Sequence, residues 1–176
     1  LVSPRFEAAY RALGRAGGTV IVLGPDYEGR IAGAQSAEPQ IAAQPEDGLL
    51  ILYTSGTTGM PKGALISHRA ELARMDLSRI DAGLEEGDSF VAWAPMFHMV
   101  SLEHALHVLG LGGKVFVVDG ADIPRLLQLV AAERQWWLVL IPGMIEPLVA
   151  ALREGRVRPK GIKVVGALAD LLPPQL

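Results

Sequence analysis

Short apolar runs alternate with segments of helical periodicity along most of the chain. The runs of strand length cover residues 19–23, 49–53, 64–66, 90–94, 114–118, 137–141 and 162–165. Helical spacing of apolar residues, with residues typical of helix ends, predicts helices over 6–16, 26–34, 67–79, 101–109, 122–134 and 143–153. From Phe90 onward, each strand is followed by a short helix and then by another strand. This order is typical of βαβ units and predicts an α/β fold, in which helices cover a mostly parallel sheet.

Polar and small residues mark the expected ends of several helices. Gly17 and Gly18 are expected to end the first helix. Ser67 is a plausible N-cap for the helix predicted over 67–79. Asp122 is a plausible N-cap for the helix predicted over 122–134, which has Pro124 in its first turn.

Composition narrows the class of protein. Half of the 176 residues are hydrophobic and the formal net charge is −3 at pH 7, so we expect one globular domain without general affinity for nucleic acid. Cysteine is absent, which excludes disulfides and thiolate chemistry and favours a cytoplasmic protein. The longest apolar window, residues 136–152, is interrupted by prolines, a glycine and a glutamate, so no membrane span is predicted.

Both ends of the sequence have the pattern of a segment cut from a longer chain. Residues 1–3 read as the end of a strand, and residues 171–176 stop where a new helix is expected to begin. We therefore expect residues 1–176 to be a single-domain fragment.

A loop of hydroxyls and glycines separates the apolar runs 49–53 and 64–66. The first run has the pattern of a strand buried on both faces. The loop contains Thr54, Ser55, Gly56, Thr57, Thr58 and Gly59, and is followed by Pro61 and Lys62. Glycine amides and hydroxyls can surround an anion, and Lys62 adds a charge suited to phosphate oxygens. No Walker sequence fits these residues. A mobile surface turn is the alternative, but the Pro-Lys-Gly and the flanking strands favour phosphate binding.

The sequence Tyr-Thr-Ser-Gly-Thr-Thr-Gly-Met-Pro-Lys-Gly at residues 53–63, with Ser67-His68 after the next strand, resembles the phosphate-binding signature of the acyl-adenylating (AMP-forming) superfamily. This superfamily holds the acyl- and aryl-CoA synthetases, the peptide-synthetase adenylation domains and the beetle luciferases. The resemblance implies that the chain is a middle portion of the large N-terminal domain of such an enzyme. It also implies that Lys62 is a catalytic residue. The residues that it implies as ligands of the ATP phosphates are Thr54, Ser55, Gly56, Thr57, Thr58, Gly59 and Lys62.

The segment Pro95-Met96-Phe97-His98 follows a predicted strand and resembles the second motif of the superfamily, which borders the acyl pocket. The resemblance implies Phe97 and His98 as wall and gate of the carboxylate site. The alternative is a turn at the end of a strand, with the imidazole bonded to backbone.

The segment Gly166-Ala167-Leu168-Ala169 resembles the small-residue turn that lies against the adenine and the acyl group in this superfamily. It departs by one residue from the usual Gly-Gly-Ala, and a packed turn is the alternative reading. The candidate pocket residues here are Gly166 and Ala167. Because ligands bind at the carboxyl ends of parallel strands, we expect this turn, the phosphate loop, 95–98 and 142–143 to converge on one crevice.

The resemblance implies ATP-dependent activation of a carboxylic acid, followed by transfer of the acyl group from AMP to coenzyme A. ATP, Mg²⁺ and coenzyme A are the implied cofactors and co-substrates. The motifs look more like those of an acyl-CoA synthetase acting on a fatty acid than those of a peptide synthetase. We expect the fragment alone to have no turnover, because further superfamily motifs would lie beyond Leu176. A non-catalytic nucleotide- or phosphate-binding module and a structural fragment remain alternatives.

His104 and His107, with Glu103 beside them, could in principle bind a metal ion. Two ligands without a second cluster make a weak site, and no His-Glu-x-x-His sequence is present, so we expect no metal there. Trp136 and Trp137 are expected to serve as core and surface cover rather than as a stacking platform.

Overall fold

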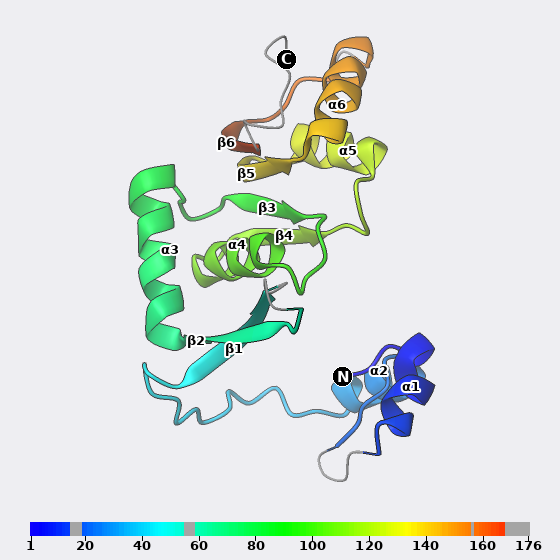
Figure 1. Ribbon diagram of the computed structural model, residues 1–176. Helices are drawn as coiled ribbons and strands as arrows, with labels where there is room; N and C mark the ends of the chain where they lie inside the picture. The colour runs from blue at the N-terminus through cyan, green and yellow to red at the C-terminus, as the bar shows by residue number, and fades with distance from the viewer. Residues whose placement is uncertain (15–18, 55–58, 156, 168–176) are drawn as a thin grey trace. The chain divides into compact units, whose positions relative to one another are not determined.

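The fold is that of a computed structural model, which describes residues 1–14, 19–54, 59–155 and 157–167 (Figure 1). The chain divides into two compact units, Leu1–Ala42 and Ala43–Leu176. Several residues with a predicted role lie outside the described ranges: Gly17, Gly18, Ser55, Gly56, Thr57, Thr58, Leu168 and Ala169.

The first unit contains short helices. They are the 3₁₀ helix η1 (Pro4–Phe6) and the helices α1 (Glu7–Ala12) and α2 (Pro25–Ala32). The helix predicted over 26–34 is confirmed. The first helix ends earlier than predicted, and Gly14 follows it with a φ of 60°, which glycine adopts without steric cost.

The buried strand predicted over 19–23 was wrong. The described residues there form a single parallel bridge, between Val2 and Val22, and none of them is fully buried. A β-branched run becomes a strand only when neighbouring strands offer it a ladder and cross-strand side chains. Within the described part of this unit, residues 19–23 have one short neighbour and no such ladder.

A four-stranded sheet organises the second unit. Its strands lie in the order β4 (Lys114–Val117), β3 (Ser89–Ala92), β5 (Gln135–Leu140) and β6 (Ile162–Ala167). Every neighbouring pair is parallel. The prediction of an α/β fold with a mostly parallel sheet is therefore confirmed.

Three helices make the crossovers of this sheet: α4 (Met99–Gly110), α5 (Ile123–Ala132) and α6 (Pro142–Glu154). Two buried clusters result. One joins Phe90 and Ala92 to residues of α4, and the other joins Val91 to residues of α5 and α6. Since alternate residues of a strand point to opposite faces, α4 covers one face of the sheet and α5 and α6 cover the other. β3, buried along its whole length, lies between them.

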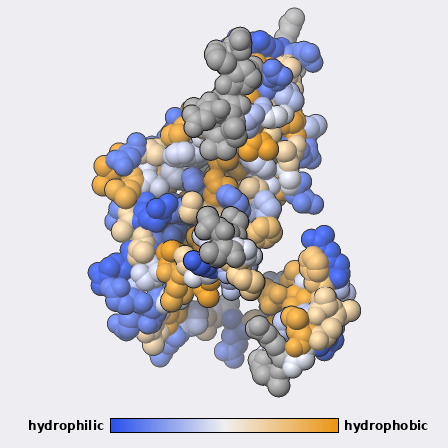
Figure 2. All heavy atoms as spheres, in the orientation of Figure 1, coloured by the Kyte–Doolittle hydropathy of each residue, from blue (hydrophilic) through white to orange (hydrophobic). Residues whose placement is uncertain are grey.

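A two-stranded antiparallel hairpin precedes the parallel sheet. It consists of β1 (Gly48–Thr54) and β2 (Lys62–Ser67), and α3 (His68–Ala82) follows it directly. The expectation that 49–53 is buried on both faces was wrong, because Ile51 and Tyr53 are largely exposed. Figure 2 shows hydrophobic residues at the surface over this hairpin. The hairpin has only two strands, so no other described strand covers its apolar residues.

The predicted N-caps are confirmed. The Ser67 hydroxyl accepts a hydrogen bond from the amide of Ala70 at 3.2 Å, and the Asp122 carboxylate accepts one from Arg125 at 3.0 Å. Each cap satisfies an amide that the first turn of a helix leaves unpaired.

No helix in the described ranges is both long and apolar enough to cross a membrane.

Candidate functional site

The ends of the predicted phosphate loop lie side by side. Thr54 is the last residue of β1, Lys62 is the first of β2, and the two are direct partners in the antiparallel register. The Thr54 hydroxyl donates to the Lys62 carbonyl at 3.4 Å. Gly59 has a φ of 84°, a conformation that favours glycine. The hairpin thus presents a hydroxyl and an exposed ammonium group at one end, a combination that fits phosphate oxygens.

A pocket of about 430 Å³ lies where β3, β5 and β6 end. Three strand-end segments and one helix contribute to it, as expected for the carboxyl ends of parallel strands. Its lining consists of Trp93, Ala94, His98, Val100, His104, Trp137, Val139, Leu140, Ile141, Gly166 and Ala167. Among the described residues, none from the β1–β2 hairpin lines this pocket.

Three of the four pocket residues predicted from the sequence line this pocket: His98, Gly166 and Ala167. Phe97 does not, and 84% of its surface is exposed. His98 also serves as the N-cap of α4, since its Nδ1 accepts the Val100 amide at 3.2 Å. The imidazole is therefore bonded to backbone and lines the pocket at the same time, so the two readings of this residue are compatible.

Aromatic rings form much of the pocket wall. The indole of Trp93 is fixed by a 2.8 Å hydrogen bond to the Val139 carbonyl. His104 and Trp137 meet edge to face, with ring centroids 5.2 Å apart. Burial lowers the pKa of His104, so this imidazole is neutral at pH 7 and adds no charge to the wall. The pocket is apolar and ring-lined, and suits the uncharged part of an organic acid.

The sequence interpretation missed two of these ring residues. Trp93 directly follows β3, and Trp137 was expected to be surface cover. Their position beside this pocket depends on which strands become neighbours. The prediction that Trp136 belongs to the core is confirmed, because its side chain is fully buried. Trp136 and Trp137 are consecutive in β5, so their side chains point to opposite faces of the sheet. This is the one local signal that the two side chains differ in environment.

Known proteins resemble this chain over most of its length. A family described as AMP-binding enzyme matches residues 9–176. This chain belongs to that family. Among its relatives, 4-coumarate–CoA ligase 5 of Oryza sativa subsp. japonica is 32% identical over 167 residues, covering 88% of this chain and 30% of the relative. The 4-chlorobenzoate–CoA ligase of Pseudomonas sp. (strain CBS-3) is 29% identical over 138 residues, covering 77% of this chain and 26% of the relative.

Solved structures agree with the assignment to the AMP-binding enzyme family. The crystal structure of ATP-bound MatB from Rhodopseudomonas palustris superposes with a TM-score of 0.76 at 26% identity, covering 97% of this chain and 36% of that one. The fold predicted from the resemblance, an α/β fold of the acyl-adenylating type, is thereby confirmed. The chain spans between about a quarter and a third of the length of the curated relatives named above, at 30% and 26%.

Proposed function

We propose that this chain is the phosphate- and acid-binding part of an acid–CoA ligase that works through an acyl-adenylate. One observation carries the proposal: the antiparallel pairing that places Thr54 opposite Lys62 at the mouth of the signature loop. The pairing brings the two ends of the loop together and places the exposed ammonium group of Lys62 there. These residues would hold the β- and γ-phosphates of ATP together with Ser55, Gly56, Thr57, Thr58 and Gly59.

Lys62 has the central role in this proposal. Activation of a carboxylate by ATP brings two anions together, so the charge of the triphosphate must be compensated before the carboxylate can attack. The carboxylate oxygen then bonds to the α-phosphorus and the bond to pyrophosphate breaks. In the second step the thiol of coenzyme A attacks the acyl carbon and AMP leaves. Mg²⁺ would supply further compensation on the phosphates, and we assign no residue of this chain to it.

The acid is proposed to bind in the ring-lined pocket, with His98 as its proposed gate and with Gly166 and Ala167 in its lining. Phe97 remains a proposed wall residue of the complete enzyme. A fatty acid is the first candidate that the sequence motifs suggested. The rings of Trp93, His104 and Trp137 favour an aromatic acid as the second, because flat apolar groups stack on such rings. The relatives named for 4-coumarate and 4-chlorobenzoate support this second candidate.

The experiment that tests the proposal is carboxylate-dependent exchange of pyrophosphate into ATP. It should be run on this chain and on the full-length protein that contains it, with short, medium and long fatty acids and with benzoates and cinnamates. We expect exchange in the full-length protein and no turnover in the 176-residue chain alone. The acid that gives the highest rate identifies the substrate class.

If the full-length protein shows no pyrophosphate exchange with any acid of the panel, the proposal is contradicted. ATP binding without exchange would then support a non-catalytic nucleotide-binding module. No ATP or pyrophosphate binding at all would support a structural role.

A further inference from the structure

A cluster of ligating side chains lies between α3 and α4, away from the signature loop. Glu71 of α3 and Glu103 and His107 of α4 each offer one atom, and these atoms all lie within 4.8 Å of one another. The three residues are only 6%, 5% and 3% exposed. Buried carboxylates of this kind need a partner that compensates their charge.

Two atoms of this cluster have no hydrogen-bond partner among the described residues: Glu71 Oε1 and His107 Nε2. They lie 3.2 Å apart, yet not in the alignment of a donor and an acceptor. When two atoms bind the same tetrahedral cation at about 2.0 Å each, they lie roughly 3.3 Å from one another. Their lone pairs then point at the cation and not at each other. The observed pair has this spacing.

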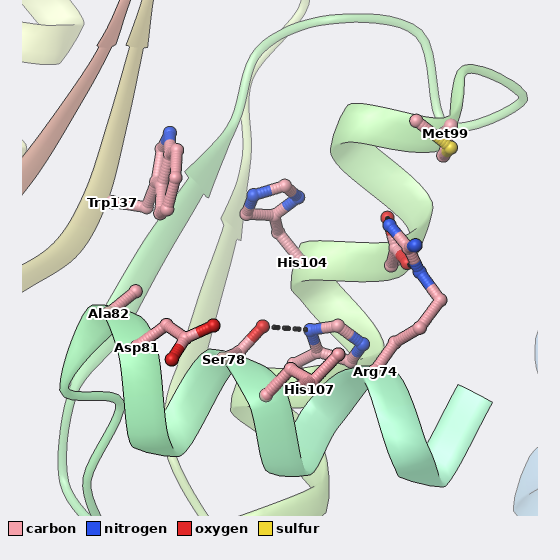
Figure 3. Close-up of a pocket in the computed structure, with 10 residues that line it drawn as sticks. Arg74, Ser78, Asp81, Ala82, Met99, His104, His107 and Trp137 are labelled. Atoms are coloured by element: carbon pink, nitrogen blue, oxygen red, sulfur yellow. Dashed lines mark hydrogen bonds and ion pairs between the residues drawn. The ribbon is translucent and has the colours of Figure 1, made fainter. Parts of the chain in front are cut away.

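The opposite nitrogen of the same ring is held in place. Ser78 Oγ of α3 lies 3.0 Å from His107 Nδ1, and Figure 3 shows this contact across the two helices. Metal-binding histidines are typically oriented by a hydrogen bond at their second nitrogen, which leaves the other lone pair directed at the metal. Burial lowers the pKa of His107 to about 4, so the ring is neutral at pH 7, the form that binds a metal.

Arg74 compensates only part of the charge. Its guanidinium group donates to both carboxylate oxygens of Glu103, at 2.9 Å from Nη2 to Oε2. Each carboxylate oxygen has two lone pairs, so Glu103 can keep Arg74 and still bind a cation. Two carboxylates, one guanidinium group and a neutral imidazole leave one negative charge. Burial also raises the pKa of Glu71, against the effect of Arg74, as expected for a carboxylate that lacks a cation.

Two pockets give access to the cluster. One, of about 320 Å³, is lined by Glu103 and His107, and Figure 3 shows its α3 and α4 walls. The other, of about 230 Å³, is lined by Glu71 and His107. The cluster therefore borders two pockets, from which a cation and a water molecule would enter.

We propose that Glu71, Glu103 and His107 form a binding site for a divalent first-row transition metal, with Zn²⁺ as the first choice and water as the fourth ligand. One imidazole and two carboxylates suit Zn²⁺, whereas Mg²⁺ and Ca²⁺ prefer oxygen ligands alone. The bound ion clamps α3 to α4. The sequence interpretation considered His104 with His107; the structure replaces His104 by Glu71, which lies 36 positions away from His107 in the sequence. This inference does not depend on the proposed ligase activity.

The test is calorimetric titration of the chelator-treated chain with Zn²⁺. We expect one strong site, and we expect His107→Gln and Glu71→Gln each to weaken it by about 100-fold. His104→Gln is the matched control, because His104 lies one turn away on the same helix and outside the cluster. Its Zn²⁺ affinity should equal that of the wild type.

X-ray absorption spectroscopy of the Zn²⁺-loaded wild type decides the matter if a variant fails to fold. A shell of one imidazole nitrogen and oxygen ligands at about 2.0–2.2 Å supports the site. The proposal is overturned if the wild type shows no single strong site, if His104→Gln and His107→Gln weaken binding equally, or if the spectrum shows two or more imidazoles. A proton shared between Glu71 and His107 would then be the simplest account of the pair.

Discussion

Trp137 lies against the backbone of Gly166, so closely that a β-carbon on residue 166 would overlap the indole nitrogen. The two residues are on neighbouring parallel strands, β5 and β6, and both line the proposed acid pocket. The absence of a side chain at Gly166 therefore permits the indole to lie where it does. The sequence interpretation assigned Gly166 to the pocket because small residues permit close approach; in this structure the group that approaches it is Trp137.

Substitution of Gly166 by alanine should reshape the pocket without removing any polar group. The new methyl group forces the indole of Trp137 to move into the pocket space. In the full-length protein we expect the KM for the acid to rise by about tenfold or more, with the KM for ATP unchanged. Steady-state kinetics on the best acid of the panel measures both.

Gly143→Ala is the matched control for this experiment. Gly143 follows β5 on α6, and a β-carbon there meets no atom within 4 Å. Its KM values should equal those of the wild type. Equal KM values for the acid in Gly166→Ala and Gly143→Ala would contradict the assignment of this pocket to the acid.

Lys62→Ala removes the positive charge at the mouth of the signature loop. Since this charge is proposed to compensate the triphosphate, we expect pyrophosphate exchange by the full-length protein to fall by about 100-fold. We also expect the increase in Tm caused by ATP to shrink. Lys160→Ala is the control, because Lys160 bonds the Ala132 carbonyl at a different place in the fold. Unchanged exchange in Lys62→Ala would remove the catalytic role of this lysine.

The sequence predicted the parallel sheet and its helices because local signals and the global fold agree there. Residues 90–92 of β3 are apolar and become buried on both faces, and Ser67 and Asp122 cap the helices where expected. The apolar runs 19–23 and 49–53 likewise predicted buried strands. A hydrophobic run does not determine how many neighbouring strands will cover it.

The same distinction between local signals and tertiary packing applies to the candidate site. The signature loop was readable because its chemistry lies in consecutive residues. The rings of Trp93 and Trp137 in the pocket wall and the Glu71–His107 contact were not, since they join residues from separate elements whose neighbours are set by tertiary packing. A local pattern around His107 showed His104 and Glu103, and nothing in it indicates that α3 would bring Glu71.

A buried carboxylate ties together the amino ends of three strands. Asp88, just before β3, is fully buried and accepts hydrogen bonds from Arg134 at 3.0 Å and from Lys163 at 2.8 Å. Asp88→Asn should destabilise the chain by about 2–3 kcal/mol, because both cations lose their buried partner but remain partly exposed to water. Urea unfolding measures the change. The exposed Asp119 has no such role, and Asp119→Asn should change the free energy of unfolding by less than about 0.5 kcal/mol.

His107 should make the chain less stable in mild acid. Its pKa is lowered from 6.5 to about 4, chiefly by burial, with smaller effects of His104 and Arg74. Between these two pKa values the unfolded chain binds a proton that the folded chain does not, so stability falls as the pH drops from about 6.5 and levels off below about 4. The raised pKa of Glu71 acts in the opposite direction, because there the folded chain binds the extra proton.

Comparison with His107→Gln isolates the effect of the histidine on stability, since Glu71 is present in both proteins. With EDTA present, urea unfolding at pH 7 and pH 5 should show that the wild type loses about 1–2 kcal/mol more than the variant. An equal loss in the two proteins would mean that His107 takes up its proton in the folded chain as readily as in the unfolded one, and that the α3–α4 interface does not exclude the charged ring.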